Sequence, residues 1–252
     1  MADSNDRDSF VRFSDRAGDY IRYRPTYPAE AVEAILDGLG PPERLVAADV
    51  GAGTGISARL LGERGVRVIA VEPGDAMRRA AAPHPNVAWV AGRAEATGLC
   101  SQAVDLVLCA QSFHWFRTTD ALAEFARILK ERRRLAIMWN RRSTSDPLTA
   151  GYRQAIVDVG GELSAESRPF DPDVIGDSGL FSPPERKSFP NSQRVDLAGL
   201  IGRARSASYV PKSGAAGERL LSLLRALHER YADGTGLVTL VYDTEVFCST
   251  RL

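Results

Sequence analysis

Residues 46–60, VAADVGAGTGISARL, carry the most informative pattern in this chain. Its first three residues are short and apolar, which predicts the end of a buried strand that Asp49 closes. From Ile56 onward, apolar residues recur at helical spacing. Between the strand and the helix lie three glycines within five positions, Gly51, Gly53 and Gly55. Because glycine adopts unusual dihedrals and lets a ligand approach the backbone closely, this glycine corner predicts a nucleotide-type binding site.

The bulk composition narrows the class of protein. A chain of 252 residues with 44% apolar content is long enough for a sizeable core. Lys plus Arg and Asp plus Glu number 32 each, a balance that favours neither a nucleic-acid nor a membrane partner. The first ten residues are polar and acidic, unlike a targeting peptide, and the three cysteines lack metal-ligand spacing. We expect a cytoplasmic protein without a membrane span or a bound metal.

After the glycine corner, strand and helix patterns alternate. Continuous β-branched or apolar runs predict strands at 66–71, 86–90, 104–109 and 135–139, with helices at 74–82 and 118–130 between them. This alternation predicts an α/β fold with a parallel sheet covered on both faces.

The later chain follows another pattern. Asp146 and Pro147 open a helix with a capping carboxylate, and residues 167–185 are rich in Pro, Gly and Ser, which predicts a long loop. A weak strand at 186–189, helices from 196 and at 216–231, and a strand at 237–248 are expected to complete the fold.

The glycine motif has two possible interpretations as a binding site. A dinucleotide fingerprint needs G-x-G-x-x-G, but here Ile56 occupies the sixth position, where its side chain would crowd the helix–strand packing. The motif instead resembles the D-x-G-x-G-T-G pattern of class I methyltransferases that use S-adenosylmethionine. The matching residues are Asp49, Gly51, Gly53, Thr54 and Gly55.

Three further motifs resemble the type 11 group of small-molecule methyltransferases, including trans-aconitate methyltransferase-like proteins. They are H-W-F at 114–116, Y-R-P-x-Y-P at 23–28 and W-N-R-R at 139–142. The P-G-G usual before the fifth strand is replaced by E-R-R-R at 131–134, which predicts a locally altered turn.

The resemblance implies a Rossmann-like, doubly wound, seven-stranded sheet, mostly parallel with an antiparallel last strand. It further implies a single domain with four parts: an N-terminal arm or lid, a cofactor-binding core, a partly helical substrate cover and a final strand. These parts span residues 1–28, 29–142, 143–235 and 236–252.

The same resemblance implies where S-adenosylmethionine binds. Glu72 ends the second strand, where a carboxylate can accept hydrogen bonds from both ribose hydroxyls. The adenine-side loop at 91–99 departs from the family by carrying Arg93 where an acid is common, so Glu95 either replaces that acid or is merely exposed. The expected cofactor-binding residues are Tyr20, Arg24, Asp49, Gly51, Ala52, Gly53, Thr54, Glu72, Pro73, Met77, Ala94, Glu95, Ala110 and Gln111.

The acceptor is expected to lie beside the segment that ends the fourth strand. His114 is interpreted either as a packed histidine or as a general base, since imidazole can accept a proton from an attacking hydroxyl or amine. The expected acceptor-binding residues are Tyr23, His114, Trp115, Trp139 and Arg141.

These patterns predict transfer of a methyl group to an oxygen, nitrogen or carbon atom of a small molecule. A carboxylate acceptor would need no base and would give Arg24 or Arg141 a role instead. A cofactor-binding regulatory protein without turnover and an NAD-type oxidoreductase remain as alternatives.

Overall fold

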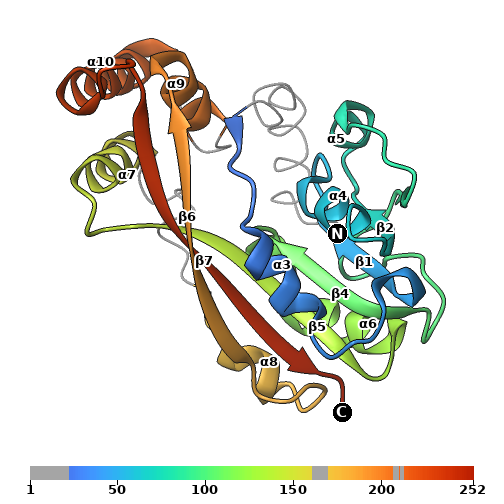
Figure 1. Ribbon diagram of the computed structural model, residues 1–252. Helices are drawn as coiled ribbons and strands as arrows, with labels where there is room; N and C mark the ends of the chain where they lie inside the picture. Colours follow the sequence, from blue (N-terminus) through green and yellow to red (C-terminus); the bar gives the residue numbers. More distant parts are fainter. Residues whose placement is uncertain (1–22, 161–169, 207–209, 211–212) are drawn as a thin grey trace. The chain divides into compact units, whose positions relative to one another are not determined.

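The computed structural model describes residues 23–160, 170–206, 210 and 213–252 (Figure 1). Within these residues, seven strands form one sheet in the order β3-β2-β1-β4-β5-β7-β6, and β7 runs antiparallel. The strands are β1 (Val46–Val50), β2 (Arg67–Val71), β3 (Val87–Val90), β4 (Val104–Ala110), β5 (Leu129–Arg142), β6 (Glu185–Val195) and β7 (Val238–Thr250). The expected mostly parallel Rossmann-like sheet with an antiparallel last strand is therefore confirmed.

Helices connect these strands in the alternating order that the sequence predicts. The α-helices are α3 (Ala29–Leu36), α4 (Ile56–Gly62), α5 (Asp75–Ala80), α6 (Thr118–Ile128), α7 (Pro147–Gly160), α8 (Asp173–Asp177), α9 (Leu197–Arg205) and α10 (Gly214–Tyr231). Two short 3-10 helices are η1 (Pro42–Arg44) and η2 (Phe113–Trp115). The expected capping carboxylate is confirmed, because Asp146 Oδ1 accepts a hydrogen bond from the Thr149 amide at 2.7 Å.

Two segments differ from the sequence prediction. The fifth strand begins at Leu129, so the segment 131–134 lies inside β5 and is not a turn before it. Arg132 takes a left-handed φ of 54°, and the β4–β5 register shifts between Val104 and Leu106. The charged side chains of this irregular part conceal its strand character. The loop expected at 167–185 contains the short helix α8.

The described residues form two compact units by their contacts. The core unit takes its described residues from Thr26–Asn140, Phe170–Phe189 and Thr244–Leu252. The accessory unit takes its own from Met1–Pro25, Arg141–Pro169 and Pro190–Asp243.

In the core unit, successive residues of each central strand point to opposite faces of the sheet. Leu106 and Leu108 pack with α3 and α4 on one face, whereas Val107 and Cys109 pack with α6 and α8 on the other. This two-sided burial explains why the sequence of β4 is continuously apolar. The parallel strands β1, β2 and β4 end together at their carboxyl ends, where an open sheet of this type binds ligands.

The accessory unit has a separate apolar core. Leu148 and Tyr152 of α7, Leu200 of α9 and Leu220 and Leu224 of α10 pack together in it. The division into a core, a cover and a final strand expected from the sequence stays a prediction.

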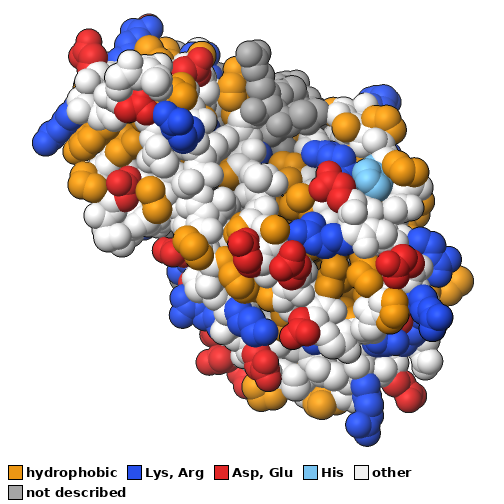
Figure 2. Space-filling view, in the orientation of Figure 1, with side chains coloured by type: hydrophobic (Ala, Val, Ile, Leu, Met, Phe, Trp, Pro, Cys, Tyr) orange, Lys and Arg blue, Asp and Glu red, His pale blue; other side chains and the backbone are white. Residues whose placement is uncertain are grey.

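The surface carries both signs of charge. On the face that Figure 2 shows, basic and acidic side chains are interspersed and do not form a patch of one sign. Within the described residues, no helix is long and apolar enough to span a membrane. Nor do His, Cys, Asp and Glu side chains of those residues gather in a group that could hold a metal ion.

Candidate functional site

The glycine corner joins β1 to α4 through three residues with left-handed backbone. The φ angles of Gly51, Gly53 and Gly55 are 69°, 57° and 77°, a region that side chains strongly disfavour. A Cβ on Gly51 would lie 2.6 Å from the Cβ of Ser112, and one on Gly55 would lie 2.8 Å from the ring of Trp89. Glycine is thus required both by the turn and by the close packing around it.

Glu72 is fixed beside this corner by backbone amides. Its Oε2 accepts a hydrogen bond from the Gly53 amide at 2.9 Å, and its Oε1 accepts one from the Gly74 amide at 2.8 Å. Burial raises the pKa of this carboxyl group, while the two amide hydrogen bonds oppose the rise. Each carboxylate oxygen has a further lone pair, so Glu72 can still accept hydrogen bonds from two hydroxyl groups of a ligand.

Asp49 is completely buried at the end of β1. Its Oδ2 accepts a hydrogen bond from the Ser57 hydroxyl at 2.6 Å, a partner that the sequence motif does not reveal. Burial raises the pKa of Asp49 to about 7, with the Ser57 hydrogen bond opposing the rise. Within the described part of the chain, Asp49 Oδ1 and Thr54 Oγ1 are buried without a hydrogen-bond partner. The corner thus offers orphaned polar atoms, and its glycines leave close access to the backbone, which fits a polar cofactor.

Two further groups of predicted cofactor-binding residues also lie in the core unit. Pro73 and Met77 follow Glu72, and the side chain of Met77 is buried. Ala94 is buried in the loop at 91–99, whereas Glu95 Oε1 accepts a hydrogen bond from the Arg117 amide at 2.8 Å. Glu95 therefore contacts the start of α6, and its role toward adenine stays a prediction.

The segment after β4 packs directly against the glycine corner. The Ser112 hydroxyl donates a hydrogen bond to the Val50 carbonyl at 2.8 Å. Gln111 has a left-handed φ of 57°, and its amide donates to the Met138 carbonyl at 2.9 Å. This bend turns the chain into η2, so His114 lies two residues from the contact with β1. Sequence reasoning did not identify Ser112, although its hydroxyl joins the two predicted parts of the site.

His114 belongs to a group of aromatic rings. Its ring centroid lies 4.6 Å from that of Trp115 and 5.2 Å from that of Trp139. Trp139 in turn lies 5.8 Å from Phe170, a residue of the Pro-rich segment that no sequence signal connected with the site. The structure thus brings together three of the predicted acceptor residues, namely His114, Trp115 and Trp139.

The remaining predicted residues lie elsewhere in the chain. Tyr20 is outside the described residues. Tyr23, Arg24 and Arg141 belong to the accessory unit, where the Arg24 guanidinium donates to the Ser206 carbonyl at 3.4 Å and the Tyr23 carbonyl accepts from Gln193 at 3.0 Å. Their roles toward a cofactor or an acceptor stay predictions.

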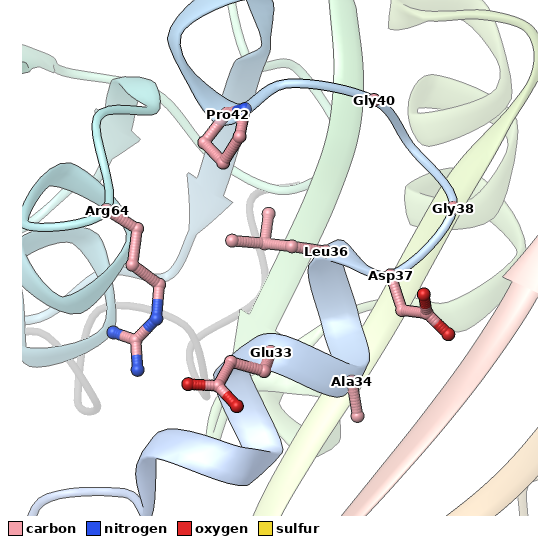
Figure 3. Close-up of a pocket in the computed structure, with 8 residues that line it drawn as sticks. All are labelled: Glu33, Ala34, Leu36, Asp37, Gly38, Gly40, Pro42 and Arg64. Atoms are coloured by element: carbon pink, nitrogen blue, oxygen red, sulfur yellow. The ribbon is translucent and has the colours of Figure 1, made fainter.

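A surface cavity of about 630 Å³ lies at the carboxyl end of α3 and contains none of the predicted site residues (Figure 3). Arg64, in the loop after α4, faces α3 across this cavity. The Arg64 guanidinium donates to the Leu60 and Ala29 carbonyls at 2.9 and 3.2 Å. These contacts give Arg64 a structural role.

Comparison with known proteins agrees with this geometry. Residues 48–137 match the family model described as a methyltransferase domain, and they include the glycine corner, Glu72 and His114. This segment is therefore similar to methyltransferase domains, and the similarity covers only part of the chain.

Two curated relatives are described as uncharacterized methyltransferases. An uncharacterized methyltransferase of Mycobacterium tuberculosis is 41% identical over 140 residues, which cover 54% of this chain and 55% of that protein. An uncharacterized methyltransferase-like protein of Schizosaccharomyces pombe is 37% identical over 140 residues, 54% of each chain. The chain thus spans about half the length of these curated relatives.

A solved structure shares the fold. It belongs to a protein of Anaeromyxobacter dehalogenans described as a candidate type II methyltransferase, with a TM-score of 0.62 and 23% identity. The match covers 91% of this chain and 97% of that one. At this identity the likeness concerns the fold alone.

Proposed function

We propose that this protein transfers a methyl group from S-adenosylmethionine to a small-molecule acceptor. The observation that carries the proposal is the Glu72 carboxylate, held by the Gly53 and Gly74 amides beside the glycine corner. When bound, S-adenosylmethionine supplies a methyl group already activated by the positive charge of its sulfonium.

The chain's own residues would hold this cofactor by shape and by polar contacts. Glu72 would accept hydrogen bonds from the ribose hydroxyls, and the left-handed glycines would leave room for the ligand against the backbone. Pro73, Met77 and Ala94 would enclose the adenine. Asp49, Ala52 and Thr54, with Ala110 at the end of β4 and Gln111 after it, would bound the amino-acid end.

The acceptor would lie beside the aromatic rings that follow β4. His114 would accept the proton of an attacking hydroxyl or amine, while Trp115, Trp139, Tyr23 and Arg141 would orient the acceptor. Most of the catalytic effect would come from alignment of the two reacting atoms and from exclusion of water, because the leaving group needs no activation.

The function is tested by following formation of S-adenosylhomocysteine from S-adenosylmethionine across a panel of hydroxyl, amine and carboxylate acceptors. We expect turnover that depends on the acceptor. His114→Ala should lower kcat by about 100-fold or more with a hydroxyl acceptor, a magnitude typical of a lost general base, and leave the affinity for S-adenosylhomocysteine unchanged.

His228→Ala serves as the matched control, because His228 belongs to α10 of the accessory unit, contacts the Gly236 carbonyl and is not a predicted site residue. This control should retain the wild-type kcat. Equal kcat values for wild type and His114→Ala would assign His114 to packing. A protein that binds the cofactor and methylates no member of the panel would favour a regulatory role.

A further inference from the structure

Four rings of the core unit form a continuous cluster, made of His114, Trp115, Trp139 and Phe170. Their neighbouring centroids lie 4.6, 5.2 and 5.8 Å apart, and Phe170 rests on the rings of Phe113 and Phe247 at 5.5 and 5.3 Å. Trp115 is 39% exposed, and the other three are half-buried. Phe113 and Phe247 therefore hold the cluster in place, while the four rings of the cluster keep accessible surface.

This aromatic cluster lies just beyond the carboxyl end of β4 and beside the adjacent part of β5. Ala110, the last residue of β4, pairs with Met138, so Trp139 is the first residue of β5 beyond the end of its neighbour. Ser112, just before the cluster, touches both Val50 and Gly51 of the glycine corner. The rings are thus connected to the proposed cofactor site within one unit.

The cluster contains an unsatisfied donor. The indole nitrogen of Trp139 is buried, and it has no hydrogen-bond partner in the described ranges of the chain. A buried indole N–H normally finds an acceptor, since leaving it unpaired is costly. An indole can only donate, so its missing partner must be an acceptor atom such as oxygen.

A phenolic hydroxyl can form hydrogen bonds with both Trp139 and His114. Its oxygen can accept a hydrogen bond from the Trp139 N–H, and its proton can be given to His114, whose ring centroid lies 5.2 Å from that of Trp139. Its planar ring suits stacking or edge contacts with indole and phenyl groups.

We infer that the methyl acceptor is a planar aromatic compound with a hydroxyl group on the ring, bound by the aromatic cluster. This inference rests on the proposed function and narrows its acceptor. In the reaction, a bond forms between the phenolic oxygen and the methyl carbon as the bond between that carbon and the sulfonium sulfur breaks. The phenolic proton passes to His114 and then to solvent, and the products are an aryl methyl ether and S-adenosylhomocysteine.

The test uses 2-naphthol as the probe and naphthalene, which lacks the oxygen, as its matched control. Binding of each to the full chain saturated with S-adenosylhomocysteine is measured for wild type and Trp139→Phe. The variant keeps an aromatic ring and removes the N–H. We expect it to bind 2-naphthol about 5- to 10-fold more weakly, the effect of one hydrogen bond, and to bind naphthalene as wild type does.

Turnover provides the second readout. Wild type should convert 2-naphthol to 2-methoxynaphthalene and leave adipate, an aliphatic dicarboxylate, unmethylated. Equal 2-naphthol affinities in the two proteins, no binding of 2-naphthol, or methylation of adipate in preference to 2-naphthol would each overturn the inference. Failure to bind S-adenosylhomocysteine would instead overturn the proposed function, so the two failures are distinguishable.

Discussion

Asp49 is a buried carboxyl group whose charge should make stability depend on pH. Burial raises its pKa in the folded protein to about 7, above the value near 3.8 of an exposed aspartate. Between these two values the folded state binds more protons than the unfolded state, so stability falls as pH rises. The stabilisation is fully present below the unfolded pKa and is lost as the pH passes the folded pKa.

The side chain that Asp49→Asn introduces is neutral at every pH. This variant should therefore not lose stability in this way as the pH rises. Relative to the variant, wild type should lose about 3 kcal/mol of unfolding free energy between about pH 5 and pH 8, measured by urea unfolding at each pH. Glu72 titrates in both proteins, so its contribution largely cancels in the comparison. Parallel pH profiles for the two proteins would show that Asp49 is ionised throughout.

The sequence indicates which residues form the glycine corner, but it does not indicate which hydrogen bonds hold them in place. The motif identifies Asp49, and the end of β2 identifies Glu72. Ser57 and Ser112 escaped prediction because their contacts join segments whose spacing differs from one fold to another. Their hydroxyls donate to Asp49 Oδ2 and to the Val50 carbonyl.

Among the elements, α3 is held at its carboxyl end by arginines of β5. Arg134 Nη1 donates to the carbonyls of Ile35 and Asp37, each at 2.7 Å, and Arg133 Nη1 donates to the Leu39 carbonyl at 2.9 Å. The last carbonyls of a helix lack partners within the helix, and a nearby positive charge is also favourable there. These contacts explain the last two arginines of the E-R-R-R sequence at 131–134.

Arg134→Ala should therefore destabilise the protein by about 1 to 3 kcal/mol, the cost typical of hydrogen bonds to a charged group. Urea unfolding measures this loss. The exposed Arg132 is the control, and Arg132→Ala should change stability much less. Both variants should bind S-adenosylhomocysteine as wild type does. An Arg134→Ala protein as stable as wild type would contradict a clamping role.

The contacts of Arg133 and Arg134 also show why the boundaries of β5 could not be predicted. Only the apolar part of the strand, near 135–139, has a strand pattern in the sequence. The preceding charged residues extend β5 to Leu129 through a bulge at Arg132, and tertiary contacts with α3 stabilise them there.

For the whole molecule, the strand–helix alternation predicted the parallel sheet, and the resemblance to methyltransferases implied its antiparallel last strand. The acceptor site was predicted less completely. Phe170 lies 31 residues after Trp139 in a segment without periodicity, so its contact with Trp139 depends on the tertiary fold. The predicted roles of Tyr23, Arg24 and Arg141 concern the accessory unit and await test.

We propose that the glycine corner and Glu72 bind S-adenosylmethionine, and calorimetric titration of S-adenosylhomocysteine measures this binding without turnover. Glu72→Gln should weaken binding by about 10- to 100-fold through loss of charged hydrogen bonds, whereas Glu63→Gln, at an exposed position, should bind as wild type does. NADH should give no binding heat. Binding of NADH without S-adenosylhomocysteine, or equal affinities in wild type and Glu72→Gln, would contradict the account.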